Sequence, residues 1–323
     1  MKRVLITGAR SPAALEWCRI LHSCGCGVFL VDSLDVCIAK YSNSIQKFIK
    51  ISSPRFHFER FRSDLTDLID REKIDLIIPT CEEVFFLVQA MKVQPRLSKL
   101  LFADSERVTH RLHSKFEFIS WARDLGLAVP ETERIPRRDD LQKMDLNTNN
   151  WVLKPEFSRF ASDTVLNKKE LNHWMKKRKW TRQNWIRQRK IKGEEFSSYG
   201  ICVNGDIKLH VVYKSLFRAG KGAGIAIKKA NIPTIEKWVY SFVKKISYTG
   251  QIAFDFILTD DGRALAIECN PRATTGIHFW ARAPHLVGNA LFNSNPPSLS
   301  SHLGYGPTTA DSIILKPIMW SYG

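Results

Sequence analysis

The chain lacks several features that would assign it to a common class. Its 323 residues include seven cysteines without a CxxC pair, and cysteines scattered through apolar runs are typical of reduced thiols in a cytosol-like compartment. No apolar run approaches the length of a membrane span, and the four-residue run before Gly8 is too short for the core of a signal peptide. We therefore expect a soluble, cytoplasmic protein without a transmembrane segment.

Glycine-rich phosphate loops are also missing. Gly8 follows the first apolar run alone, so a dinucleotide fingerprint is absent, and Asp32 is expected to serve in a cap or turn rather than to bind ribose. The one glycine-dense stretch, GKGAG at 220–224, lacks the GxxxxGK[ST] signature. Arg218 and Lys221 flank or lie in it, and we interpret it as a turn that folds over a substrate.

Acidic residues are outnumbered: 49 Lys and Arg against 32 Asp and Glu give a net charge of +17. Such a chain attracts polyanions, which include nucleotides, nucleic acids and acidic proteins. No acid lies between Lys176 and Lys192, where Trp180 and Trp185 alternate with cations. This run predicts either a nucleic-acid surface or, as we favour, a solvated helix face with core tryptophans.

The N-terminal third has the pattern of a βαβ unit. RVLITG and VFLVDS are strand-like, SPAALEWCRILHSCG between them is helical, and KIDLIIPT supplies a later strand. Thr80, Glu82 and Glu83 follow that later strand at its carboxyl end, where open α/β sheets bind ligands. They are candidate substrate contacts, with capping of the next helix as the alternative.

The pattern changes near residue 104. Residues 104–132 predict a helix with Lys115 inside it, and residues 184–215 alternate as antiparallel strands with a tight turn at Asn204-Gly205. The histidines show no triad or zinc spacing, so His210 and His278 are expected to be structural or to line a pocket.

The segment 251–272, QIAFDFILTDDGRALAIECNPR, predicts a hairpin, because Asp-Gly joins two apolar runs. Glu268, Asn270 and Arg272 share one face if the chain stays extended through them. Asp255 interrupts the other apolar run, where a lone carboxylate would be costly to bury. Two carboxylates and an amide oxygen suit Mg²⁺, and an arginine beside them suits phosphate.

The order of these pieces resembles the ATP-grasp superfamily, and within it the short proteins similar to the carbamoyl phosphate synthetase large subunit. The resemblance covers nearly the whole chain and implies an α/β and α+β fold. It implies a Rossmann-like domain at 1–104, an ATP-grasp N-terminal lobe at 105–190 and a C-terminal lobe with the metal hairpin at 191–323.

The resemblance also implies roles for individual residues. Lys115 and Lys154 would bind ATP phosphates, residues 158–162 would form the phosphate-covering loop, and Arg272 would contact phosphate. Asp255, Glu268 and Asn270 would hold Mg²⁺, or Mn²⁺ in its place. The remaining nucleotide contacts would be Ser158 in the loop, Gln188, Arg189 and Ile191 at the adenine, and Glu195 at the ribose.

Two departures from the family pattern stand out: no glycine lies between Pro155 and Lys192, and Gln188 stands where a glutamate is more usual. The function implied is ATP-dependent ligation of a small carboxylate to an amine through an acyl phosphate. Two alternatives remain. One is a ligase that adds amino acids to an acidic macromolecule, and the other is a polyanion-binding module on a degenerate scaffold without catalysis.

Overall fold

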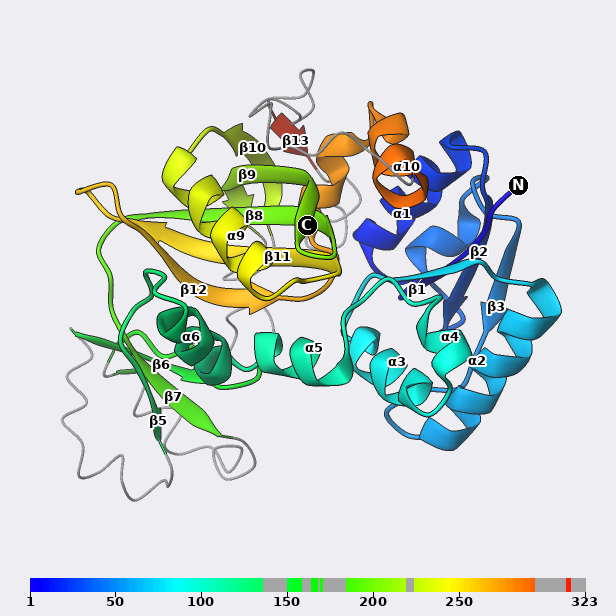
Figure 1. The fold of residues 1–323 in the computed structure, drawn as a ribbon, viewed down its shortest axis with the longest axis horizontal. Helices are drawn as coiled ribbons and strands as arrows, with labels where there is room; N and C mark the ends of the chain where they lie inside the picture. The colour runs from blue at the N-terminus through cyan, green and yellow to red at the C-terminus, as the bar shows by residue number, and fades with distance from the viewer. Residues whose placement is uncertain are drawn as a thin grey trace.

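The structure is a computed structural model that describes residues 1–135, 150–158, 164–167, 169–170, 184–218, 224–293 and 312–314. Within these ranges the strands form a four-stranded, a three-stranded and a six-stranded sheet (Figure 1). Each sheet falls inside one of the three predicted domains, whose boundaries stay a prediction. The expected mixture of a parallel sheet with antiparallel sheets is confirmed.

The N-terminal part is a parallel sheet with helices on its faces. Its strands are β1 (Arg3–Thr7), β2 (Gly27–Asp32), β3 (Lys47–Lys50) and β4 (Leu76–Pro79), in the order β3-β2-β1-β4. Its helices are α1 (Pro12–Ser23), the short η1 (Ile38–Tyr41), α2 (Phe58–Glu72), α3 (Glu83–Lys92) and α4 (Pro95–Ser98). Ser11 caps α1 by accepting from the Ala14 N–H. The βαβ opening is thus confirmed, and β3 was not anticipated.

The helix predicted over residues 104–132 is two helices, α5 (Glu106–His113) and α6 (Lys115–Asp124). Ser114 separates them, because its extended backbone ends α5 while its Oγ accepts from the Glu117 N–H and caps α6. The stretch is helical as predicted, and Lys115 lies in a helix, but the stretch is two helices rather than one. Lys115 is the first residue of α6, which brings its side chain close to the end of the neighbouring strands.

The other two sheets form the remainder of the described fold. The small sheet has the order β5-β7-β6, and the large one the order β12-β11-β8-β9-β10-β13. The elements are β5 (Thr132–Ile135), β6 (Trp151–Pro155), β7 (Trp185–Arg189), β8 (Glu194–Val203), β9 (Asp206–Arg218), β10 (Gly224–Ala230), α9 (Pro233–Lys245), β11 (Gly250–Leu258), β12 (Ala264–Asn270), η3 (Thr275–Trp280), α10 (Pro284–Phe292) and β13 (Ser312–Ile314).

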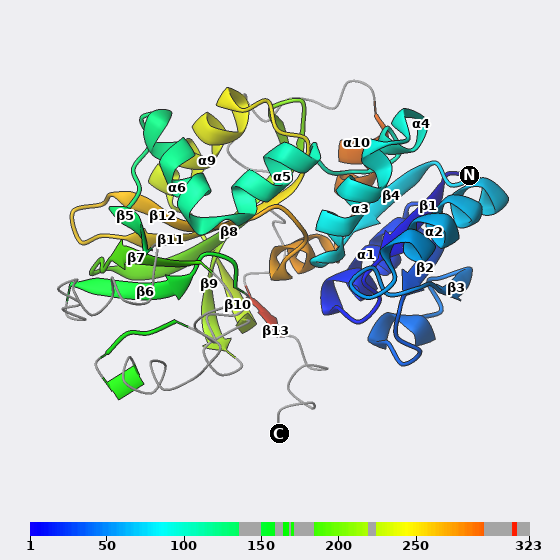
Figure 2. The same ribbon diagram turned by 90° about the horizontal axis from the view of Figure 1, so that it is seen from below.

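The two faces of the large sheet have different partners. On one face, Phe254 and Phe256 pack against Trp238 of α9, and α6 adds Phe118, so that both helices lie on the same side (Figure 2). On the other face, Tyr199 belongs to a core shared with Trp17 of α1 and with η3 and α10. The N-terminal sheet is therefore attached to the large sheet through a common hydrophobic core.

The structure also bears on the predicted turn, on the cysteines and on membrane-spanning helices. Asn204 and Gly205 form the tight turn between β8 and β9, with φ of 51° and 82°. All seven cysteines are free thiols. No helix in the described part of the chain is long and apolar enough to cross a membrane.

Candidate nucleotide and metal site

A row of polar side chains crosses four strands of the large sheet. Tyr213 of β9 pairs with Ser197 of β8, Ser197 pairs with Asp255 of β11, and Asp255 pairs with Glu268 of β12. Residues directly opposite one another share a face, so these side chains lie on the face that also packs against α1. The predicted hairpin is confirmed, and its two carboxylates face each other because of its register.

The two carboxylates influence each other electrostatically. Burial, reinforced by the like charge of Glu268, raises the pKa of Asp255 to about 6. Burial also opposes ionisation of Glu268, yet the nearby charges of Lys115 and Lys154 lower its pKa below the ordinary value. Ser197 Oγ donates to Asp255 Oδ1 at 2.7 Å. The pair therefore concentrates negative charge that a cation would stabilise.

The donor set fits a hard divalent cation. Asn270, the last residue of β12, adds a buried amide oxygen beside the carboxylate pair. The described residues contain no cluster of three or more His, Cys, Asp or Glu, and within them the site consists of two carboxylates and an amide. Mg²⁺ keeps several waters and takes further oxygens from phosphates, so such an open set suits it.

Arg272 lies beyond the end of the strand rather than on it. The chain turns after Asn270, where the Arg272 N–H donates to the Asn270 carbonyl, so the backbone is not extended through Arg272 as the shared face required. The guanidinium of Arg272 nevertheless contacts the site, since its Nη2 donates to Asn270 Oδ1 at 3.2 Å. It also forms a 3.0 Å ion pair with Glu82. Thr80, Glu82 and Glu83 are the substrate contacts that the sequence suggests after β4. Of these, Glu82 contacts a residue of the candidate site.

Lys115 approaches the carboxylates from the start of α6. Its side chain is almost fully buried, and Nζ is 3.5 Å from Glu268 Oε2. The same Nζ donates to Ser158 Oγ at 3.2 Å, and so connects Glu268 to the segment after β6. Residues 159–162 of the expected phosphate-covering loop lie outside the described ranges.

Lys154 of β6 is buried, and its Nζ donates to Gln188 Oε1 at 2.9 Å. Burial lowers the pKa of Lys154 to about 8, although the negative charge of Glu268 acts in the opposite direction. Gln188 in turn donates to Thr132 Oγ1 at 3.2 Å. The amide of Gln188 therefore holds Lys154 in this structure, a role that the sequence did not indicate.

The expected adenine and ribose contacts lie at the junction of the small and large sheets. Arg189 ends β7, and its N–H donates to the Glu131 carbonyl at 2.8 Å. Ile191 follows β7 and is partly buried. Glu195 of β8 forms a 2.6 Å ion pair with Arg218 of β9. These residues lie along one stretch of chain between the two sheets.

The carboxyl edge of the N-terminal sheet is filled by its own side chains. Glu83 is buried and accepts from Thr7 Oγ1 and from the Thr80 N–H. A Cβ on Gly8 would meet Glu83 Oε1 at 2.5 Å. Asp32 accepts from the Leu34 N–H and pairs with Arg10 at 3.0 Å, which agrees with the expected turn role. The space directly beside Gly8 is therefore filled by the carboxylate of Glu83.

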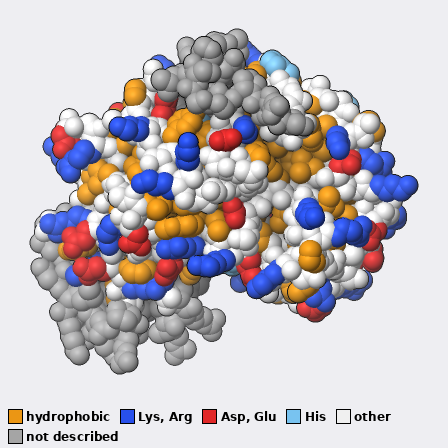
Figure 3. Space-filling model, in the orientation of Figure 1, with side chains coloured by type: hydrophobic (Ala, Val, Ile, Leu, Met, Phe, Trp, Pro, Cys, Tyr) orange, Lys and Arg blue, Asp and Glu red, His pale blue; other side chains and the backbone are white. Residues whose placement is uncertain are grey.

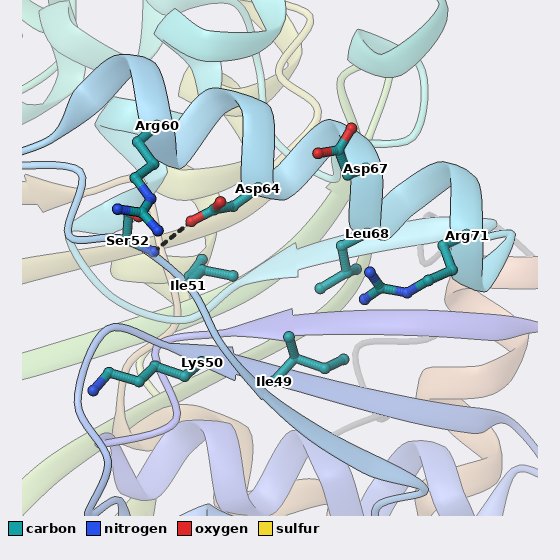
Figure 4. Close-up of a pocket in the computed structure, with 9 residues that line it drawn as sticks. All are labelled: Ile49, Lys50, Ile51, Ser52, Arg60, Asp64, Asp67, Leu68 and Arg71. Carbon is teal, nitrogen blue, oxygen red and sulfur yellow. Dashed lines mark hydrogen bonds between the residues drawn. The ribbon is translucent and has the colours of Figure 1, made fainter.

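A separate cavity of about 380 Å³ lies between β3 and α2 (Figure 4). Charged residues line it, but Asp64 already accepts from the Ser52 N–H, and Lys50 pairs with Asp35. In Figure 1, β3 and α2 lie at the opposite end of the molecule from the small sheet. Figure 3 shows Lys and Arg side chains spread over the visible face among acids and apolar side chains, without a single basic patch there. Of the predicted basic run, residues 176–183 lie outside the described ranges, and residues 184–192 lie within them.

Sequence reasoning missed Ser197, Tyr213 and the contacts of Gln188. Tyr213 OH is 3.4 Å from Thr274 Oγ1 and from Thr275 Oγ1, just after the metal hairpin. No local motif marks these residues, because their places depend on the register between strands that are far apart in the chain. The expected structural role of His278 agrees with its 2.7 Å contact to Glu16 of α1.

The sequence profile of the ATP-grasp domain matches residues 112–276, which is more than half of the chain. The chain belongs to the ATP-grasp family. The matched segment begins just before Lys115 and ends just after Arg272, so it includes every nucleotide and metal contact that the sequence analysis expects, but not Thr80, Glu82 and Glu83. A comparison with curated protein sequences finds no match.

Solved structures confirm the ATP-grasp fold. L-amino acid ligase from Bacillus licheniformis is 15% identical with a TM-score of 0.64, over 84% of this chain and 67% of that chain. N5-carboxyaminoimidazole synthetase from Staphylococcus aureus, complexed with ADP, is 15% identical with a TM-score of 0.68, over 87% and 73%. Biotin carboxylase from Campylobacter jejuni, in an ATP complex, is 14% identical with a TM-score of 0.68, over 90% and 70%.

At these identities the likeness establishes the fold and not the reaction. The predicted ATP-grasp membership and the predicted fold class, a Rossmann-like domain followed by the two-lobed fold, are confirmed. The narrower resemblance to the carbamoyl phosphate synthetase large subunit stays a prediction, as do the roles of the individual site residues.

Proposed function

We propose that this chain is an ATP-dependent carboxylate–amine ligase that works through an acyl phosphate. One observation carries the proposal: the carboxylates of Asp255 and Glu268 face each other, and the charges of the buried Lys115 and Lys154 act on Glu268. Phosphoryl transfer requires mainly positioning and neutralisation of phosphate charge, and this is the chemistry that such a set supplies.

In the proposed reaction, Asp255, Glu268 and Asn270 would hold Mg²⁺, which when bound neutralises charge on the ATP phosphates. Lys115, Lys154 and Arg272 would bind phosphate oxygens. Gln188, Arg189 and Ile191 would border the adenine, Ser158 would contact phosphate, and Glu195 would accept from the ribose hydroxyls.

Two steps then follow. An oxygen of the substrate carboxylate attacks the γ-phosphorus of ATP, and ADP leaves. The nitrogen of an amine attacks the acyl carbon, inorganic phosphate leaves, and the amine releases a proton to solvent. Arg272 and its partner Glu82 lie at the edge of the N-terminal sheet, and this supports entry of the acceptor there.

Hydroxylamine tests the proposal, because it converts an acyl phosphate to a hydroxamate. With ATP, Mg²⁺ and a panel of amino acids and other small carboxylates, we expect ADP and a hydroxamate whose mass identifies the carboxylate. ADP formation without any hydroxamate would contradict the acyl phosphate. Absence of nucleotide binding would contradict the whole proposal and leave the polyanion-binding alternative, which rests largely on residues outside the described ranges.

A further inference from the structure

An ion pair lies beside the carboxylates of the candidate site. Arg218 Nη2 is 2.6 Å from Glu195 Oε2, and the pair connects the end of β9 to the start of β8. On β8, Glu195 lies two residues before Ser197, the residue that pairs with Asp255 of β11, so Glu195 is on the same face of the sheet as Asp255. The charges of Glu195 and Arg218 both act on Asp255. Both members of the pair therefore act electrostatically on the carboxylate that would hold the metal.

The pair is weakly fixed. The side chain of Arg218 is 39% exposed and that of Glu195 is 56% exposed. Exposed pairs contribute little to stability, because water screens the charges and ordering two long side chains costs entropy. Arg218 can therefore leave Glu195 for a stronger anion. A guanidinium is always charged, and its planar donors match the oxygens of a phosphate group.

ATP would change the balance at both ends of this pair. Glu195, if it accepts from the ribose hydroxyls, has to share or release the guanidinium that now contacts it. The triphosphate brings negative charge next to Asp255 and Glu268, and Arg218 is a cation of the large sheet whose charge already acts on Asp255. When ATP binds, the site gains the negative charge of the phosphates, and Glu195 releases the positive charge of Arg218 that can neutralise it.

We propose that Arg218 is a phosphate-binding residue of the nucleotide site, held by Glu195 before ATP binds and exchanged to the γ-phosphate when the ribose engages Glu195. The inference rests on the proposed function, since it requires ATP at this site. It adds a residue from β9 to a phosphate set that otherwise comes from α6, β6 and the end of β12.

The chain provides a matched control on the same two strands. Lys214 Nζ is 2.6 Å from Glu194 Oε1, with side-chain exposures of 40% and 54%. This pair has nearly the same length and exposure as the Arg218–Glu195 pair and joins the same two strands, while alternation along β8 turns Glu194 to the face opposite Glu195. Neither Lys214 nor Glu194 is among the main charges that act on Asp255 or Lys154.

The experiment measures the dissociation constants of a non-hydrolysable ATP analogue, ADP and adenosine, each with Mg²⁺, for wild type, Arg218→Gln and Lys214→Gln. Hydrogen bonds to charged groups predict that Arg218→Gln weakens the ATP analogue by about tenfold or more. ADP should weaken less, and adenosine should not change. Arg218→Lys should retain much of the preference for ATP, because a point charge still attracts phosphate. Lys214→Gln should bind all three ligands like wild type.

Equal weakening of the ATP analogue and adenosine in Arg218→Gln would overturn the inference, as would no weakening of either. The same loss in Lys214→Gln would show a general charge effect and would also overturn it. If wild type binds the ATP analogue and Arg218→Gln binds it equally well, the inference fails while the proposed function stands. If wild type binds no ATP analogue, both fail. Thermal unfolding without ligand confirms that each variant is folded.

Discussion

The protonation of Lys154 should make ATP affinity depend on pH in a defined direction. Burial lowers the pKa of Lys154 to about 8, so the free protein carries a charged lysine at pH 7 and a largely neutral one at pH 9. Phosphate oxygens stabilise the charged form, so the complex binds more protons than the free protein above pH 8. Affinity for the ATP analogue should therefore fall as pH rises through about 8.

The magnitude follows from this pKa. Between pH 7 and pH 9 the charged fraction of the free lysine falls by roughly tenfold, which corresponds to a loss of about 1.4 kcal/mol of binding free energy. At pH 9 complex formation should take up about 0.9 proton, against about 0.1 proton at pH 7. Adenosine, which has no phosphate, should show neither effect.

Isothermal titration calorimetry in buffers of different ionisation enthalpy measures this proton uptake directly. Lys154→Arg provides the control, because a guanidinium stays charged at pH 9 and should bind the analogue without proton uptake. Wild type that shows no proton uptake at pH 9, or a Lys154→Arg variant that shows the same uptake as wild type, would refute this account of Lys154.

Two further predictions concern the attachment of the N-terminal sheet to the large sheet. Gln251→Leu should lower the free energy of unfolding by at least about 3 kcal/mol, because it removes the partner of three buried polar groups. These groups, which Gln251 contacts at 2.8 to 2.9 Å, are Trp17 Nε1, Tyr199 OH and the Pro79 carbonyl. Urea denaturation measures the loss, and a loss below about 1 kcal/mol would contradict the prediction. Gly276→Ala should cost about 1–3 kcal/mol by the same assay, because the new Cβ would lie 2.3 Å from Tyr199 Cβ. An unchanged midpoint in Gly276→Ala would show that η3 moves away freely.

Local chemistry made parts of the site predictable from the sequence. The hairpin of β11 and β12 follows from Asp-Gly between apolar runs, and alternation along the strands separates Asp255 from its phenylalanine neighbours. The N-terminal βαβ unit is similarly local, with Ser11 and Pro12 marking the start of α1. In these segments, propensity, pattern and turn chemistry agree.

Other features depend on contacts between distant parts of the chain. Ser197 meets Asp255 across 58 positions of sequence, and only the register of β8 against β11 brings them together. Arg272 meets Glu82 only because the N-terminal sheet packs beside the large one. The break at Ser114 was missed for another reason: a capping serine inside a helical pattern competes with the helix it interrupts.

The most direct test of the central claim is the Mg²⁺ dependence of nucleotide binding in Glu268→Gln. In wild type, Mg²⁺ should raise the unfolding temperature of the protein with the ATP analogue above its value with the analogue alone, since ligands that bind the folded state stabilise it. Glu268→Gln should fold normally and lose that Mg²⁺-dependent increase, whereas the exposed Glu194→Gln should keep it. A correctly folded Glu268→Gln variant with the full Mg²⁺-dependent increase would contradict the assignment of Asp255, Glu268 and Asn270 as the metal site.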